Sequence, residues 1–121
     1  MKPENIKFKA KRLDGKGWAI GDLLHSYENG AIIVPIEGGG AFSVDPSTIC
    51  QFTGLRDKDG KDIFENDLLY DEDSGIVSAI KWKRHICGYV YEKAGMFSTI
   101  RVIASHTGLL KIVGNKFDNE K

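Results

Sequence analysis

The sequence predicts one small, mainly β domain made of short strands. Runs of β-branched and aromatic residues are short, and clusters of Gly, Asp and Asn separate them at intervals of about 8 to 12 residues. No stretch keeps a helical period of apolar residues. The chain has 121 residues, of which 41% are hydrophobic and 28% are charged, as in a single globular domain. We expect a meander or small barrel with at most one or two short helical turns.

The first region, up to about residue 44, is expected to form β-hairpins. Residues 6–11 alternate apolar side chains with lysines, which predicts a strand with one apolar and one charged face. Residues 18–24 and 31–36 predict two further strands, and Asn29-Gly30 between them favours a type I′ turn. Three consecutive glycines at 38–40 predict a loop tip, because glycine is costly to hold in a strand.

The next region, about residues 45–66, is expected to contain turns with extended structure around residues 49–54 between them. Asp45 offers an N-cap acceptor and Pro46 suits the first helical position, so a single helical turn is predicted there. Residues 57–60 read Asp-Lys-Asp-Gly, which predicts a tight polar turn. The later strand candidates are residues 63–70, 75–82, 89–91, 97–103 and 109–113.

The charge balance argues against a partner that is attracted by the overall field of the protein. Seventeen basic residues are matched by seventeen acidic ones, so contact with nucleic acid or an anionic membrane would have to be local. The longest apolar run, residues 31–36, is far shorter than the roughly 20 residues that span a bilayer. The N-terminus lacks the pattern of a secretory signal, so we expect a cytoplasmic protein with no membrane partner.

The sequence predicts neither a metal site nor a cofactor. Residues 57–62 resemble the start of a calcium loop, which needs an oxygen ligand at position 5, glycine at position 6 and a bidentate carboxylate at position 12. Those positions hold Lys61, Asp62 and Leu68, so the match fails. His85 and Cys87 form one close pair of zinc-type ligands, whereas a zinc site needs about four. No glycine-rich loop opens a helix, so no phosphate-binding fingerprint is present. In a reducing compartment we expect Cys50 and Cys87 to be small buried thiols.

No set of residues forms a recognisable catalytic arrangement. His25, His85 and His106 lie far apart in the sequence, and the acidic run 71–73 has the character of a solvated loop tip. General acid catalysis needs a carboxyl group whose surroundings raise its pKa, and an exposed turn does not raise it. We therefore expect no catalytic residue and no enzymatic activity. Whether the histidines and the acidic turns converge in space is left open by the sequence.

One basic segment combines the groups that contact single-stranded nucleic acid. Lys81, Trp82, Lys83 and Arg84 offer phosphate contacts and a ring for base stacking. The alternation around Trp82 also fits an ordinary strand with its indole in the core and its lysines in water. We keep nucleic-acid binding as the alternative function, with the row Lys7, Lys9 and Lys11 as a second basic surface.

Residues 44–67 read Val-Asp-Pro-Ser-Thr-Ile-Cys-Gln-Phe-Thr-Gly-Leu-Arg-Asp-Lys-Asp-Gly-Lys-Asp-Ile-Phe-Glu-Asn-Asp. This block resembles the signature of the YopX-like phage and prophage protein family, and residues 6–10 and 112–119 resemble the two ends of that family. The chain departs from the pattern at Phe52, where tyrosine is usual, and at Asn66, where glycine is common. The positions that carry the resemblance are Asp45, Pro46, Gly54, Leu55, Asp57, Gly60, Asp67, Gly114 and Asn115.

The resemblance implies an origin in a phage, prophage or mobile element, and a family without an established biochemical function. It implies structural roles for the signature positions. In particular, Asp67 is expected to accept backbone N–H bonds as its turn closes. By analogy with hairpins of this kind, we expect an SH3-like barrel over residues 60–117.

The function expected from these observations is a non-enzymatic binding or accessory module that works through a β-surface or by self-association. Its protein partner is not identified by the sequence. The aromatic side chains exceed what a minimal core needs, so some of them are candidates for a partner surface. They are Trp18, Phe42, Phe52, Phe64, Trp82 and Tyr89.

Overall fold

The computed structural model describes residues 2–84, 87–93, 96–101 and 104–118. These residues form two antiparallel sheets, so the predicted mainly β class is confirmed. Their helical structure consists of four single turns, where the sequence indicated one or two, and none of them has the length and hydropathy needed to cross a membrane. The turns are η1 (Pro3–Asn5), η2 (Tyr27–Asn29), η3 (Pro46–Thr48) and α1 (Ala104–Thr107).

The chain divides into two compact units after Phe52. The boundary falls inside strand β5 (Cys50–Arg56), so this strand contributes its first residues to one unit and its last residues to the other. The expected single domain, with regions 1–44, 45–66 and 60–117, stays a prediction.

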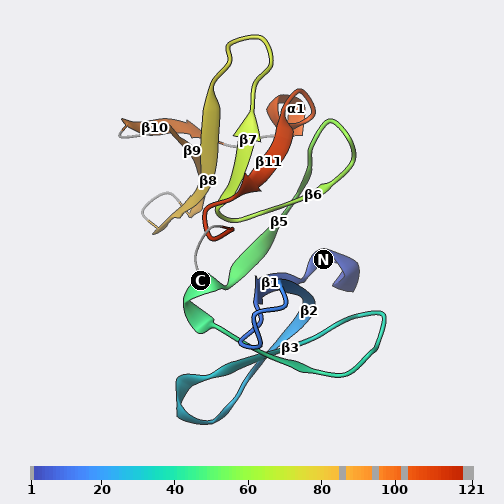
Figure 1. Cartoon of the computed structure of the whole chain (residues 1–121). Helices are drawn as coiled ribbons and strands as arrows, with labels where there is room; N and C mark the ends of the chain where they lie inside the picture. The colour runs from blue at the N-terminus through green and yellow to red at the C-terminus, as the bar shows by residue number, and fades with distance from the viewer. Residues whose placement is uncertain (1, 85–86, 94–95, 102–103, 119–121) are drawn as a thin grey trace. The chain divides into compact units, whose positions relative to one another are not determined.

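The first unit contains four strands in addition to the start of β5. Strand β1 lies between β2 and β5, and Phe8 is paired with Gly21 on one side and with Gln51 on the other. The three strands predicted in this region are present, and one further short strand, β4, was not predicted because it has only three residues. The strands are β1 (Phe8–Lys11), β2 (Trp18–His25), β3 (Ala31–Val34) and β4 (Phe42–Val44). With β5 and β6 (Asp62–Phe64) the sheet order is β4-β3-β2-β1-β5-β6 (Figure 1).

The turns of this unit follow the glycine and asparagine signals, with one shift. Between β2 and β3 the positive φ angles fall on Glu28 (59°) and Asn29 (64°), one residue earlier than the predicted Asn29-Gly30. Ser26 N donates to Gly30 O at 3.0 Å and closes this longer loop. Gly38, Gly39 and Gly40 all have positive φ, as the predicted loop tip requires.

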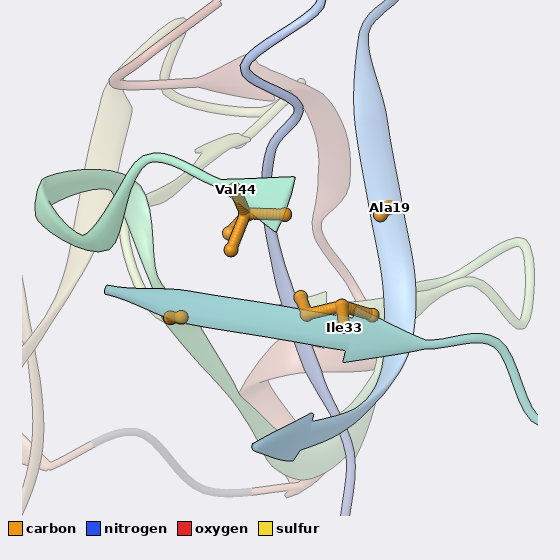
Figure 2. Close-up of a cluster of buried hydrophobic side chains, with 5 residues drawn as sticks. Ala19, Ile33 and Val44 are labelled. Atoms are coloured by element: carbon orange, nitrogen blue, oxygen red, sulfur yellow. The ribbon is translucent and has the colours of Figure 1, made fainter. Parts of the chain in front are cut away.

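The core of the first unit lies on one face of its sheet. Ala19 from β2, Ile33 from β3 and Val44 from β4 gather there, as Figure 2 shows. Ala10 and Ala31 complete the cluster of fully buried side chains. Because neighbours along a strand point to opposite faces, Lys9 and Lys11 lie on the other face, as the alternation of residues 6–11 predicted.

The second unit is a five-stranded antiparallel sheet together with β6. Its core contains Ile63 from β6, Leu69 from β7, Ile80 from β8 and Tyr91 from β9. The strands are β6 (Asp62–Phe64), β7 (Asp67–Tyr70), β8 (Val77–Lys83), β9 (Gly88–Lys93), β10 (Met96–Arg101) and β11 (Lys111–Asn115), and the sheet order is β10-β9-β8-β7-β11 (Figure 1).

The strand expected over residues 63–70 is interrupted. Asn66 has a φ of 69°, which is outside the extended region, and it separates β6 from β7. Asn66 N donates to Ile80 O at 2.7 Å, so the turn is fastened to β8. The strand is therefore interrupted by a residue with a left-handed backbone conformation, which here is asparagine rather than glycine.

The expected SH3-like barrel over residues 60–117 is wrong. Closure would require the two outer strands to pair with a suitable stagger. In the described part of the chain, β10 and β11 stand at opposite ends of the sheet, and β6 belongs to the other sheet. The sheet is therefore open.

The two cysteines differ in their environments. Cys50 is buried, as predicted, and its thiol contacts Thr48 O at 3.3 Å. The same prediction for Cys87 is wrong, because this residue is exposed in the turn that joins β8 to β9. Its φ of 47° belongs to a tight turn rather than to a strand.

Gly21 offers a test of the packing between β2 and β3. A Cβ atom at this position would lie 2.2 Å from the backbone oxygen of Val34, and glycine is typical of strands that another backbone approaches closely. We expect Gly21→Ala to lower the free energy of unfolding by about 1–3 kcal/mol, because the backbone must shift. Urea denaturation measures this, with the exposed Ile20→Ala as control. Equal stabilities of the two variants would contradict the close approach.

Candidate functional site

Asp45 and Pro46 begin the short turn η3 in the first unit. Asp45 Oδ1 accepts hydrogen bonds from Ser47 N at 3.0 Å and from Ser47 Oγ at 2.8 Å, as its position before proline predicts. The turn is joined to β1, because Lys11 N donates to Thr48 Oγ1 at 2.8 Å. These two signature residues therefore fix the turn that precedes β5.

Gly54 and Leu55 lie in β5 at the start of the second unit. Gly54 has a φ of 84°, a conformation that side chains other than glycine rarely adopt. Leu55 packs against the core of the second unit, and Thr53 Oγ1 donates to Ile63 O at 2.7 Å. The glycine therefore redirects the strand just before it joins its core.

Asp57 is buried at the end of β5, where its carboxylate organises the turn that follows. Oδ1 accepts from Asp59 N and Lys61 N, both at 2.9 Å, and Oδ2 accepts from Ile112 N at 3.0 Å. Desolvation is the largest single influence on the pKa of Asp57 and raises it, but these hydrogen bonds and the charge of Lys61 together outweigh desolvation and lower the pKa. Gly60 completes the turn with a φ of 79°.

A second buried carboxylate, Asp67, joins the turn before β7 to the end of β11. Its Oδ2 accepts from Phe64 N at 2.7 Å, and its Oδ1 accepts from the Asn115 side-chain amide at 2.8 Å. Asn115 Oδ1 in turn accepts from Phe117 N at 2.9 Å. Asp67 is only 1% exposed, so these contacts replace the water that a carboxylate would otherwise require.

Gly114 leaves room for a third acidic group beside this pair. A Cβ atom on Gly114 would lie 3.1 Å from Asp118 Oδ2, and that oxygen accepts from Asn115 N at 2.8 Å. We call the set Asp57, Asp67 and Asn115 the polar network. Its oxygens accept hydrogen bonds from backbone and side-chain N–H groups, and these bonds hold the neighbouring turns in place. Within the described residues, no group of three or more His, Cys, Asp or Glu side chains is arranged to hold a metal ion.

The basic segment of β8 does not form one surface. Lys81 and Lys83 alternate with Trp82, so the ammonium groups lie on one face of the strand and the indole on the other. Lys81 Nζ donates to Asn66 Oδ1 at 2.7 Å. Burial lowers the pKa of Lys81, and the nearby Lys116 lowers it further. Arg84 is exposed beyond the end of the strand. Nucleic-acid binding by this segment stays a prediction.

Trp82 is not in the core, contrary to the simpler interpretation of its strand. It is 45% exposed and lies edge-on to Tyr89, with 5.1 Å between the ring centroids. The two residues are directly opposite each other in the β8–β9 pairing. Ile80 and Tyr91, two pairs earlier in the same register and on the same face, belong to the buried core.

The convergence that the sequence left open is partly present. His106 and the acidic loop residues Asp71 and Asp73 line one pocket of about 410 Å³ in the second unit. His25 lies in the first unit, and His85 lies outside the described residues.

The deepest polar residue of this pocket was not predicted. Tyr91 is 8% exposed, and its hydroxyl group is buried without a hydrogen-bond partner among the residues that the structure describes. Burial raises the pKa of Tyr91 to about 12. Its position in an alternating strand signals only a core residue, so no local pattern could have identified it.

The description "YopX protein" applies to the family that matches residues 8–121. The chain belongs to the YopX family. No curated protein of similar sequence was found. Membership in the YopX family indicates a phage-associated protein. The matched residues lie in both units and include all three residues of the polar network.

The departure from the YopX-like pattern at Asn66 keeps the local conformation. Where glycine is common, Asn66 adopts a φ of 69°, which asparagine tolerates better than most residues. Its side chain also accepts the Lys81 hydrogen bond, a contact that glycine could not make. The substitution therefore preserves the turn and adds a link to β8.

Asp57 predicts an acid-dependent contribution to stability. Because its folded pKa is lowered, its contribution is fully present above the unfolded pKa of about 3.9 and is lost as the pH falls through the folded value. We expect Asp57→Asn to lower the unfolding free energy at pH 7 by about 1–3 kcal/mol, and the difference from wild type to shrink below about pH 4. Urea denaturation across this range measures it, with exposed Asp59→Asn as control. A difference that stays constant with pH would contradict the assignment.

Proposed function

We propose that this phage-associated protein is a non-catalytic binding module whose first sheet docks on an acidic protein surface. The observation that carries the proposal is strand β3, which has aliphatic side chains on both of its faces. Ala31 and Ile33 are buried in the core, while Ile32 and Val34 point to the opposite face and stay half-buried. A strand that is apolar on both faces is typical of a sheet covered on both sides.

The register brings further aliphatic side chains to this face. Leu24 of β2 is directly opposite Ile32, and Ile20 lies on the same side of β2, two alternations away. Ile20 is 48% exposed and Leu24 is 53% exposed. We call the face defined by Ile20, Leu24, Ile32 and Val34, with the neighbouring lysines of β1, the outer face.

The charge on the outer face identifies the kind of partner. Lys9 is directly opposite Ile20 in the pairing of β1 with β2, and Lys7 and Lys11 alternate with it on the same side. The Lys7 ammonium lies 4.7 Å from the Phe52 ring centroid, and the Lys9 ammonium lies 4.8 Å from that of Trp18. Asp22, directly opposite Val34, lies on the same face but is outnumbered by the three lysines. A partner with carboxylates around an apolar centre therefore complements this arrangement.

Nucleic acid fits the outer face less well. Base stacking requires an open aromatic face, and Phe52 is buried while the Lys9 ammonium lies over Trp18. The exposed aliphatic stripe offers no contact to phosphates. These features favour a protein partner, and nucleic-acid binding becomes an outcome of the test.

The non-catalytic part of the proposal is supported by the polar network. Its two carboxylates and its amide bind N–H groups of neighbouring turns, which is a structural use of the most buried acidic groups described. We further propose a prophage-encoded protein that acts in the bacterial cytoplasm. Family membership and two cysteines that remain thiols support this location.

The proposal predicts binding of a short extended peptide that alternates glutamate with valine. Fluorescence anisotropy measures its affinity, beside a matched peptide with lysine in place of glutamate. We expect the acidic peptide to bind more tightly, and the double variant Ile20→Ser with Leu24→Ser to weaken it by about tenfold or more. Leu13→Ser, which removes an aliphatic side chain that is 66% exposed in a turn, is the control and should bind like wild type.

Three results would overturn the proposal. Equal affinity for the acidic and basic peptides would remove the charge complementarity. Unchanged binding by the double variant would remove the outer face as the site. Sedimentation showing a stable dimer that the double variant abolishes, or a mobility shift with single-stranded DNA that it abolishes, would assign the face to self-association or to nucleic acid instead.

A further inference from the structure

The second unit contains a pocket that the outer face of the first unit does not involve. Its volume of about 410 Å³ falls within the range of about 300–1,000 Å³ that is usual for sites of small organic ligands. Its walls come from β7, from the loop that joins β7 to β8, from β8 and β9, and from α1 with the segment that follows it. These segments are distant in the sequence, so the pocket is a product of the fold.

The body of the pocket is apolar. Leu69 is fully buried and belongs to the core of the sheet, while Leu109 and Leu110 approach from the segment after α1. Ile76 closes the side formed by the β7–β8 loop. Removing apolar ligand surface from water would therefore drive binding here.

Tyr91 lines the pocket and carries a hydrogen-bonding group that the described residues leave unused. The side chain is more than nine-tenths buried, and its hydroxyl group has no hydrogen-bond partner among the described residues. A buried hydroxyl group without a partner is unfavourable, so a partner supplied by a ligand would relieve that cost. Burial raises the pKa of Tyr91 to about 12, so the hydroxyl group stays protonated at neutral pH and can donate.

The rim of the pocket carries negative charge. Asp71 and Asp73 both line it, and Asp71 Oδ1 accepts from Asp73 N at 3.0 Å, which holds the loop in a turn. The carboxylate between them in sequence, Glu72, is paired with Lys58 and does not line the pocket. His106 also lines the pocket. Because two carboxylates stand against one imidazole, the polar side of the pocket is suited to a cation.

We propose that this pocket binds a small organic cation with an apolar ring system and an acceptor oxygen. The ring system lies against Leu69 and Leu110, the oxygen accepts the Tyr91 hydroxyl proton, and the ammonium group faces Asp73 at the rim. This site is independent of the outer face, so either proposal can fail alone.

The test uses three indole probes that differ in one group at a time. 5-Methoxytryptamine has both the acceptor oxygen and the ammonium group, tryptamine lacks the methoxy oxygen, and 5-methoxyindole-3-acetate carries a carboxylate in place of the ammonium group. Titration of the full chain, followed through the backbone amide signals of Leu69, Ser78 and Tyr91, measures binding at the pocket. We expect the affinity to decrease in the order in which the probes are named.

Two variants assign the contacts. Tyr91→Phe should weaken the binding of 5-methoxytryptamine by about five- to tenfold and leave the affinity for tryptamine unchanged. The melting temperature of the unliganded variant should equal or exceed that of wild type. Asp73→Asn should weaken the binding of both cations by a similar factor. Glu72→Gln, the matched control in the same loop, should leave both affinities unchanged. The melting temperature separates a lost ligand contact from a damaged fold.

Each contrary result is decisive. If none of the three probes shifts the amide signals of the pocket, the proposed ligand class is wrong. If Tyr91→Phe weakens tryptamine as much as 5-methoxytryptamine, the hydroxyl group is not the contact. If the anionic probe binds as tightly as the cations, or Glu72→Gln acts like Asp73→Asn, the acidic rim does not select the charge of the ligand.

Discussion

The second unit depends on the requirement that buried N–H groups find acceptors. Three turns, before β6, before β7 and after β11, cannot provide them from regular sheet pairing. Asp57 and Asp67 supply carboxylate oxygens to backbone N–H groups in two of these turns, and Asn115 links Asp67 to the third. Because these acceptors come from distant parts of the chain, they fix the turns relative to one another.

The two units leave different kinds of surface exposed. In the first, β3 is aliphatic on both faces, while the described core covers one of them. In the second, the apolar surface is folded into a pocket with a buried hydroxyl group at Tyr91 and an acidic rim. The first surface suits an extended partner, and the second suits a compact one.

Several errors of prediction have a common cause. A strand pattern gives the face of a residue but not the position where the core ends. Trp82 follows the same alternation as Ile80, yet it lies two pairs further along β8 and is 45% exposed. Cys87 is apolar in character, yet it occupies the turn after β8. The break at Asn66 was hidden for a related reason, because asparagine marks a left-handed turn less strongly than glycine does.

The sequence by itself determined the class of fold, most of the strands, the N-cap at Asp45, and the membership of the family. These depend on local alternation, turn chemistry and a long motif, all of which act over a few neighbouring residues. Tertiary structure decided that Asp67 meets Asn115, that His106 and Asp73 share a pocket, and that the Tyr91 hydroxyl group is buried without a partner. Those relations join residues that are far apart in the chain. They arise only when the strands have paired, because pairing register and burial are properties of the assembled sheet.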